Sequence, residues 1–433
     1  MRKFFLFLFV SVLFLQTNAQ QKFLIRAGKL FDSETGTFKT NAYILVKGNA
    51  IESVQSNVAD SIKQNYQLID LSKYCVLPGL IDAHTHLLYR EVLYPFNDNA
   101  GLDMTKSLTM EGDAYRAIYG SAKAKAYLEA GITSVQDLGN SGEYADMALR
   151  RAINEGLVDG PRMRCAGKGL STEGGQIPGV IYKHRDIVND EYRIVKNTDD
   201  AIQAVRENIN QGANLIKIYS NNTPNNTMLS VDEIKAIVTE AHRYGKRVTA
   251  HATNNQAVYN AVIGGVDCIE HGYEVADSTL RLMAKKGVML VPTDGDSVTD
   301  SRYADLAYPG NKDAAVEFSA YRKILGERLQ RAIKAGVVIA AGSDDYIDFK
   351  MPFAEPSKRT LIGYHEEGVS IPAILQFATI NGSKELNWSK KIGIIKPGYW
   401  ADIIAVDNDL DININAIMQV HFVMKDGKMY VNK

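Results

Sequence analysis

The chain has 433 residues, 45% of them hydrophobic and 23% charged, and its formal net charge at pH 7 is −1. This is the composition of an ordinary globular protein, long enough for one large domain and a small one. The near-neutral charge gives no indication of a nucleic-acid partner, so we expect none. Cys75, Cys165 and Cys268 are an odd, widely spaced set with apolar neighbours. They argue against a disulfide framework, and we expect buried free thiols.

Residues 1–19 resemble a secretory signal peptide. Arg2 and Lys3 precede an apolar stretch at 4–15, and Thr17, Asn18 and Ala19 resemble a small-residue cleavage site. We therefore expect a secreted or periplasmic protein; an uncleaved anchor is the alternative. No later segment approaches the roughly 20 apolar residues of a membrane-spanning helix, so we expect no stable membrane insertion after cleavage.

Short strands separated by turns are predicted at both ends of the remaining chain, over residues 20–77 and 392–433. Neither segment alone has enough strands for independent stability. The sequence therefore predicts that the two ends combine into a small β-sandwich domain.

Between these ends, over residues 78–391, short apolar runs alternate with helical stretches, which is typical of a parallel sheet built from βα units. Ser230 and Glu233 form a predicted capping box at the start of one such helix. Eight candidate strands lie at 80–86, 134–138, 163–166, 215–219, 247–251, 268–271, 288–292 and 337–342. Eight units predict a (β/α)8 TIM-like barrel. A doubly wound open sheet is the alternative, but no glycine-rich dinucleotide motif follows an early strand.

Polar residues that suit a metal follow several of these strands. His84 and His86 end the first strand, and alternation along a strand points both rings the same way. His251, His271 and Asp344 end the fifth, sixth and eighth. Active sites of such barrels lie at the carboxyl ends of the strands. A pair of satisfied strand histidines is the alternative for His84 and His86 taken alone.

Lys217 is predicted to point into the barrel, on the same strand face as Leu215 and Tyr219. An ammonium group there is costly unless it is paired or neutralised. One solution is reaction with carbon dioxide to give a carbamate that bridges two metals. The other is a salt bridge to Asp137 or Asp344, and strand position alone does not separate them.

Taken together, these features resemble the amidohydrolase superfamily of metal-dependent hydrolases, in the branch of imidazolonepropionase-like enzymes and Xaa-Pro dipeptidases. The resemblance is carried by PGLIDAHTH at 78–86, IKIY at 216–219, His251, His271 with Gly272, GSD at 342–344 and GIIKPGYWAD at 393–402.

The resemblance implies a site for two divalent metal ions, expected to be zinc. His84, His86 and Asp344 would hold one ion, His251 and His271 the other, and carboxylated Lys217 would bridge them. Asp344 would also be the catalytic residue, as general base and then general acid. A site with one ion is the alternative if Lys217 is not carboxylated.

The function expected from this resemblance is hydrolysis of a carbon–nitrogen bond in a small molecule, such as a dipeptide or an N-acyl amino acid. Alternatives are cyclic amides, lactones or phosphoesters as substrates, or a non-catalytic binding protein. Tyr219 is a candidate substrate contact. The chain departs from its relatives at 172–176, where they tend to carry a histidine after two glycines, so the exact substrate is open. Relatives often assemble, which suggests a homo-oligomer by analogy.

Overall fold

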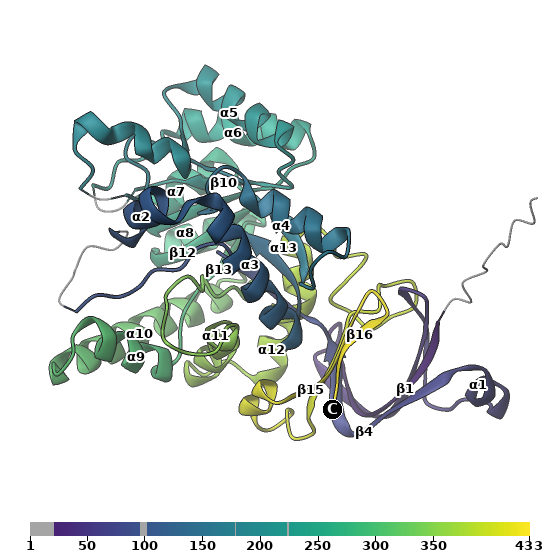
Figure 1. Cartoon of the computed structure of the whole chain (residues 1–433). Helices are drawn as coiled ribbons and strands as arrows, with labels where there is room; N and C mark the ends of the chain where they lie inside the picture. The colour runs from purple at the N-terminus through teal and green to yellow at the C-terminus, as the bar shows by residue number, and fades with distance from the viewer. Residues whose placement is uncertain (1–20, 96–101, 178, 223–224) are drawn as a thin grey trace, which may run out of the picture.

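The computed structural model describes residues 21–95, 102–177, 179–222 and 225–433, so the expected signal peptide lies outside the described residues. Two parts are visible in Figure 1: a larger part of mixed strands and helices, and a strand-rich part at the lower right. Both ends of the described chain contribute strands to the second part.

The strand-rich part is one seven-stranded sheet in the order β16-β15-β14-β4-β1-β2-β3. Its strands are β1 Lys22–Asp32, β2 Thr37–Lys47, β3 Ala50–Gln55, β4 Gln67–Pro78, β14 Ile403–Asp407, β15 Val420–Lys425 and β16 Lys428–Asn432. The two ends of the chain meet where β14 pairs antiparallel with β4, with Ile403 opposite Pro78. This join forms one sheet from segments more than 300 positions apart.

The sequence predicted a sandwich of two sheets here, and the structure corrects this to a single curved sheet. Its register shifts between Ala27 and Lys29, where β1 runs beside β4. A Cβ at the intervening Gly28 would lie 2.3 Å from the Ser72 carbonyl oxygen, so only glycine fits there. Such a shift bends a strand and increases its twist, which lets one sheet curl around one apolar core.

Among the described residues, the larger part contains nine strands in two parallel sheets. One has the order β5-β6-β7 and the other β13-β12-β11-β10-β8-β9. The strands are β5 Leu80–Thr85, β6 Ile132–Asp137, β7 Arg162–Cys165, β8 Gly169–Ser171, β9 Tyr192–Ile194, β10 Ile216–Tyr219, β11 Val248–Asn254, β12 Cys268–Glu274 and β13 Met289–Val291.

These strands make a TIM-barrel-like arrangement but not the single closed sheet that the sequence predicted. The expected third strand, 163–166, is present as β7, but it pairs only with β6, and the separate strand β8 that follows it pairs with β10 in the other sheet. The expected eighth strand is an extended segment with an isolated bridge between Leu290 and Ile339. It still joins the two sheets, because Ala340 donates to the Leu290 carbonyl at 3.0 Å and Ala83 donates to the Ala341 carbonyl at 2.9 Å.

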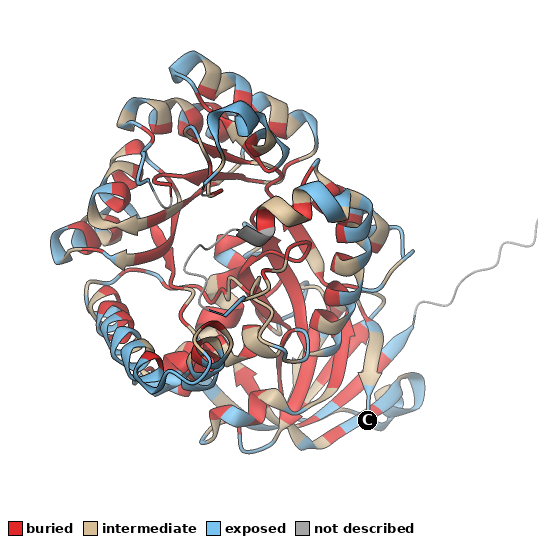
Figure 2. Cartoon of the chain, turned by 60° about the vertical axis from the view of Figure 1, so that its left-hand side comes forward, coloured by how far each residue is buried: buried red, intermediate tan, exposed pale blue. Residues whose placement is uncertain are grey.

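Helices cover the outside of this part, and Figure 2 shows buried strands and helices with exposed outer faces. They are α2 Leu102–Lys106, η1 Ser107–Glu111, α3 Gly112–Glu129, α4 Ala145–Asn154, η2 Tyr182–Asp190, α5 Thr198–Asn210, α6 Val231–Arg243, α7 Asn255–Gly264, α8 Asp277–Lys286, α9 Ser297–Ala307, α10 Lys312–Lys334, α11 Glu355–Glu366, α12 Ile371–Gln376, η3 Phe377–Asn381 and α13 Gly382–Glu385. Two short helices, α1 Asp60–Asn65 and η4 Ile414–Met418, belong to the chain ends.

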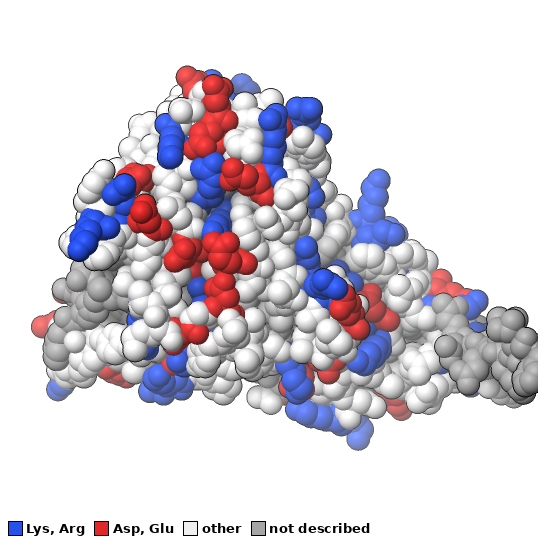
Figure 3. Space-filling model, turned by 45° about the horizontal axis from the view of Figure 1, so that its top comes forward, with Lys and Arg blue, Asp and Glu red and all other residues white. Residues whose placement is uncertain are grey.

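Local sequence signals explain several helix boundaries. The capping box predicted for α6 is confirmed: Ser230 accepts from the Glu233 amide, and the Glu233 carboxylate accepts from the Ser230 amide at 2.8 Å. No described helix combines the length and the apolar character needed to cross a bilayer. Acidic and basic side chains lie near one another on the face shown in Figure 3.

Candidate metal centre

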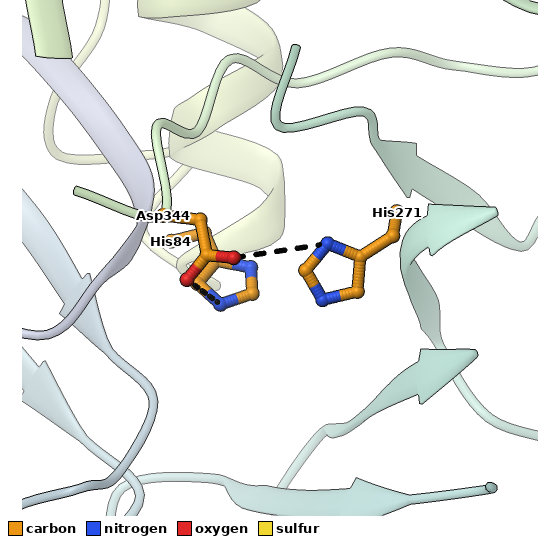
Figure 4. Close-up of side chains that lie close together, drawn as sticks. All are labelled: His84, His271 and Asp344. Atoms are coloured by element: carbon orange, nitrogen blue, oxygen red, sulfur yellow. Dashed lines mark ion pairs between the residues drawn. The ribbon is translucent and has the colours of Figure 1, made fainter. Parts of the chain in front are cut away.

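The ends of β5, β11 and β12 and the segment after residue 342 bring together the four histidines and the aspartate singled out in the sequence. Asp344 lies at the middle. Its Oδ1 atom is 3.3 Å from Nε2 of His84 and 3.1 Å from Nε2 of His86. Its Oδ2 atom is 3.9 Å from Nδ1 of His271, and the dashed lines in Figure 4 mark the ion pairs of this carboxylate with His84 and His271. The ring of His251 follows, with its centroid 4.6 Å from that of His271.

The hydrogen bonds of the two β5 histidines fix which nitrogen faces the centre. His86 Nδ1 donates to the Gly139 carbonyl at 2.8 Å. His84 Nδ1 donates to the Glu270 carboxylate at 2.7 Å. In a neutral imidazole the remaining nitrogen is then an acceptor, so both Nε2 lone pairs face the Asp344 carboxylate. Acceptors facing a carboxylate at about 3 Å repel one another unless a proton or a cation lies between them.

Two of the inward nitrogens lack any protein partner. Within the described part of the chain, Nε2 of His84 and Nε2 of His251 are buried without a hydrogen bond. A buried unpaired polar atom is costly, and native structures rarely retain one without a reason. Imidazole nitrogens and a carboxylate that converge in this way suit a divalent transition metal such as zinc. The residues present therefore fit a metal centre.

The electrostatics also favour the protonation states that bind metals. Burial lowers the pKa of His84, His251 and His271 well below its usual range, and the nearby Lys217 charge adds to the effect. These imidazoles are therefore neutral at pH 7. Burial acts to raise the pKa of Asp344, but the surrounding polar and charged groups, Lys217 among them, outweigh it, so the pKa is lowered and the carboxylate is charged.

Backbone geometry brings Asp344 close to β5. Gly342 passes so near that a Cβ there would lie 2.9 Å from the backbone nitrogen of His84. Asp344 itself has a left-handed backbone, with φ +54°, and its amide donates to the His84 carbonyl at 2.8 Å. Non-glycine residues hold this conformation only where their surroundings enforce it, and they cluster at functional sites.

Asp82 links the end of β5 to the segment after residue 342 by hydrogen bonds. Its carboxylate accepts from the His84 amide at 3.1 Å and from the Ser343 amide at 3.0 Å. It also accepts from the hydroxyls of Ser343 and Ser357, at 2.6 and 2.5 Å. Burial raises the pKa of Asp82 to about 6 in spite of these donors. These hydrogen bonds hold the end of β5 next to the segment that carries Asp344.

Lys217 lies on β10 with a fully buried side chain. Neither of the salt bridges that the sequence left open is present, since no carboxylate of the described residues lies within 4 Å of its nitrogen. Asp137 instead accepts from the Leu87 amide at 2.8 Å and from the Ser141 hydroxyl at 3.2 Å, which supports the loop after His86. Burial lowers the pKa of Lys217 against the opposing effects of Glu270 and Asp344.

Tyr219 lies beside the centre and is itself buried. Its ring centroid is 5.1 Å from that of His251 and 5.2 Å from that of Tyr192. Its hydroxyl donates to the side-chain oxygen of Asn140 at 3.4 Å. Burial raises its pKa, so the hydroxyl stays protonated. Gly169 makes room for the ring, because a Cβ there would lie 2.4 Å from Tyr219 Cε2. These contacts place Tyr219 next to His251 and leave its role toward substrate a prediction.

Glu270 is among the residues around the site that sequence reasoning missed. It immediately precedes His271 on β12, and side chains alternate along a regular strand, so one inward residue predicts an outward neighbour. His271 has a left-handed backbone with φ +72°, which breaks this alternation. Both side chains therefore reach the interior. The available signal in the sequence was an acidic residue, Glu270, directly before a predicted ligand histidine.

Comparison with known proteins agrees with this geometry. The amidohydrolase family model matches residues 75–430. The chain belongs to this family and is a hydrolase that acts on carbon–nitrogen bonds. Members of the family generally bind divalent metal ions, and His84, His271 and Asp344 form one group of described residues able to hold one.

Individual relatives are distant but match along most of their length. The chain is 26% identical to ochratoxinase from Aspergillus niger over 445 aligned positions, covering 96% of this chain and 88% of the relative. It is 24% identical to imidazolonepropionase from Caldanaerobacter subterraneus, covering 85% and 84%. A crystal structure of a Xaa-Pro dipeptidase with methionine bound in the active site superposes with a TM-score of 0.80 at 28% identity, covering 95% of this chain and all of that one.

Proposed function

We propose that this protein is a two-metal hydrolase of peptide or amide bonds, with a dipeptide or an N-acyl amino acid as substrate and zinc as the metal. One observation carries the proposal. Buried imidazole nitrogens without protein partners lie around the charged carboxylate of Asp344. This arrangement is unstable without added positive charge, and it offers the ligands that zinc prefers.

In this proposal His84, His86 and Asp344 would hold one ion, His251 and His271 would hold the other, and Lys217, carboxylated by carbon dioxide, would be a ligand shared by both. The buried amine of Lys217 has a lowered pKa, and an uncharged amine is the form that reacts with carbon dioxide. When bound, the ions would lower the pKa of water to about 7 and polarise the substrate carbonyl.

The proton transfers fall to Asp344. Its carboxylate is charged at neutral pH and reaches the centre from the side of His84 and His86. It would accept a proton from the attacking water and then donate that proton to the nitrogen of the leaving amine.

A substrate with an apolar side chain is favoured by the surroundings of the centre. An apolar cluster beside it contains Tyr89, Tyr192 and Tyr219, with Tyr346 packed against it. The Tyr346 ring centroid lies 5.9 Å from that of His86. The Xaa-Pro dipeptidase whose structure resembles this chain holds methionine, an apolar amino acid, in its active site. Aromatic and apolar surfaces of this kind recognise apolar groups by burial.

The place of action is proposed from residues 1–19, which predict export to the periplasm or the medium. Small peptides and acylated amino acids would be the substrates there, without a nucleic-acid or membrane partner. Fractionation of expressing cells with an antibody tests this, and a full-length chain that stays in the cytoplasm would refute it. Light scattering on the mature chain tests whether it forms a homo-oligomer.

The deciding experiment is hydrolysis of a panel of dipeptides and N-acyl amino acids by the mature, zinc-loaded protein in bicarbonate buffer, scored by released amine. We expect cleavage of a subset with apolar side chains and loss of activity with a chelator. Absence of cleavage, with two ions per chain measured, would refute the peptide or amide assignment. A lactone, cyclic amide or phosphoester panel would then be tested.

A further inference from the structure

Glu270 is a fully buried carboxylate that accepts a hydrogen bond from the ring of a candidate ligand, His84, and that was not predicted as a ligand itself. It lies on β12, whereas the histidine that it contacts, His84, lies on β5. These strands belong to different sheets. The contact therefore spans the interior beneath the metal centre.

Both oxygens of Glu270 are occupied by donors. Oε2 accepts from Nδ1 of His84 at 2.7 Å, and Oε1 accepts a short hydrogen bond from the Thr249 hydroxyl. Thr249 lies on β11, two residues before His251. The Glu270 carboxylate thus accepts from Thr249, which is near His251 in one half of the centre, and from the ring of His84 in the other half.

The nearby group of Cys268, Glu270 and Glu385 could in principle be a second metal site, because their ligand atoms lie within 4.8 Å of one another. Their existing bonds argue against it. Glu385 is paired with Arg247 at 2.7 Å and accepts from Gln136 at 3.3 Å. Both Glu270 oxygens already accept hydrogen bonds. This group is a hydrogen-bonded cluster in which each carboxylate already has partners.

We propose that Glu270 is a positioning residue for the metal centre: its carboxylate holds the His84 ring with Nε2 directed at Asp344, and it thereby sets the affinity of the His84 half of the site for its metal ion. This inference rests on the proposed two-metal function. A free imidazole can rotate and can carry its proton on either nitrogen, whereas Nδ1–H donation to Glu270 selects one orientation and one tautomer. Loss of such a partner typically weakens metal binding by about 10- to 100-fold.

Glu270 also links the two halves of the site physically. It is bonded through the backbone to His271 in one half and through a hydrogen bond to His84 in the other. Removing the side chain should therefore loosen His84 most and leave the His251 half with its own ligands. The expected defect is loss of one ion before the other.

The test compares Glu270→Ala and Glu270→Gln with the wild type by metal analysis after equilibration against graded zinc buffers. We expect Glu270→Ala to bind one ion about 100-fold more weakly. Glutamine keeps an acceptor oxygen for His84, so Glu270→Gln should recover most of this loss and bind about tenfold more weakly than the wild type. The cobalt-loaded protein gives an independent readout, since a change in ligand geometry shifts its visible absorption.

Glu385→Gln is the matched control, because it removes another buried carboxylate of the same interior that touches no histidine. We expect it to lower the thermal midpoint while metal affinity and the cobalt spectrum stay as in the wild type. Wild-type affinity in folded Glu270→Ala would overturn the positioning role. Equal losses in Glu270→Ala and Glu385→Gln would overturn it too, as a general effect of buried charge. A wild-type chain that binds no metal would instead refute the proposed function.

Discussion

The seven-stranded sheet and the strand ends of the barrel-like part differ in the kind of side chain that they bury. The core of the sheet is apolar, with Phe23, Ile44 and Phe422 among its buried members. The strand ends bury histidines, a lysine and carboxylates, and they hold His271 and Asp344 in left-handed backbone conformations. The comparison indicates that one region contributes mainly stability and the other gives up stability for a reactive site.

This contrast can be tested because each region offers changes that should affect only one property. Removing a ligand from the strand ends should abolish turnover and leave folding largely intact. Removing an apolar side chain from the sheet should do the reverse. The predictions below run from the largest expected effect to the smallest.

Replacing Lys217 with alanine should have the largest effect. The side chain is the expected bridge between two ions, so we expect metal content to fall by about one ion per chain and turnover to be nearly abolished. Metal analysis and the peptide panel measure both. Lys123→Met is the control, because Lys123 is another buried lysine, paired with Asp345 at 3.5 Å and outside the centre. Full activity in Lys217→Ala would rule out the bridging role.

Replacing Asp344 with asparagine should lower kcat by about 10³-fold, since a general acid–base group typically contributes about 10²- to 10⁴-fold. Asparagine keeps the shape and loses the charge and the proton acceptor. The measurement is kcat on the best substrate of the panel at a metal concentration that saturates the variant.

The adjacent aspartate supplies the control for that variant. Asp345 accepts from the Tyr127 hydroxyl at 2.7 Å and does not reach the histidines. We expect Asp345→Asn to change kcat by only a few-fold while lowering stability by about 1–3 kcal/mol, because Lys123 loses its charged partner. A loss of kcat equal to that of Asp344→Asn would contradict the assignment of Asp344 as the catalytic residue.

In the sheet, replacing Phe422 with alanine should lower the free energy of unfolding by about 3–5 kcal/mol, the usual range for removing a buried aromatic ring. The residue is fully buried in the core of the sheet. Denaturant unfolding measures the loss, and kcat should be unchanged where the protein is folded. Leu68→Ala on β4 is the control, because Leu68 is 56% exposed and should cost little. A large fall in kcat in folded Phe422→Ala would show that the two regions are coupled.

The smallest predicted effect concerns pH and Asp146, which lies at the start of α4. Burial raises its pKa to about 7 from an ordinary value of 3.8. Between these values the folded state holds a proton that the unfolded state releases, so the stability contributed by this group falls as pH rises from about 4 to about 7. The shift allows at most about 4 kcal/mol, and water penetration reduces this, so we expect about 2 kcal/mol.

Asp146→Asn removes the titrating group, so its stability difference between pH 4 and pH 7 should be smaller than that of the wild type by this amount. Chemical denaturation at the two pH values measures it. Asp296 is a suitable comparison because it is also buried but is paired with Arg359 at 2.9 Å. An unchanged pH dependence in Asp146→Asn would contradict the raised pKa.

Much of the fold could be predicted because the signals are local. Alternating and continuous apolar runs predicted strands close to their observed positions, as with β10 at Ile216–Tyr219 against an expected 215–219. The β6 strand begins two residues earlier than expected, at Ile132. The capping box of α6 needed only residues three apart. Local patterns of this kind report backbone conformation because they arise from neighbouring side chains.

The departures from prediction have non-local causes. The division into two sheets between β7 and β8 and the loss of a regular eighth strand depend on which neighbours each backbone meets. The expected sandwich is a single sheet in the structure, and its register shift at Gly28 depends on the close approach of the Ser72 backbone. Amino-acid composition and hydrophobic periodicity cannot predict such close contacts, because they carry no information about distances between strands.

The sequence by itself indicated the family, through motifs that resemble it, and it predicted which strand ends carry polar residues, because side chains repeat every second residue along a strand. The six candidate ligands and their roles are implied by that resemblance and stay predictions. Only the tertiary structure decided which atoms face the centre. The left-handed backbone at His271, the inward turn of Glu270 and its hydrogen bond to His84 depend on contacts between strands distant in sequence. A side chain's chemistry is local, whereas the position and protonation of its atoms are set by what packs around it.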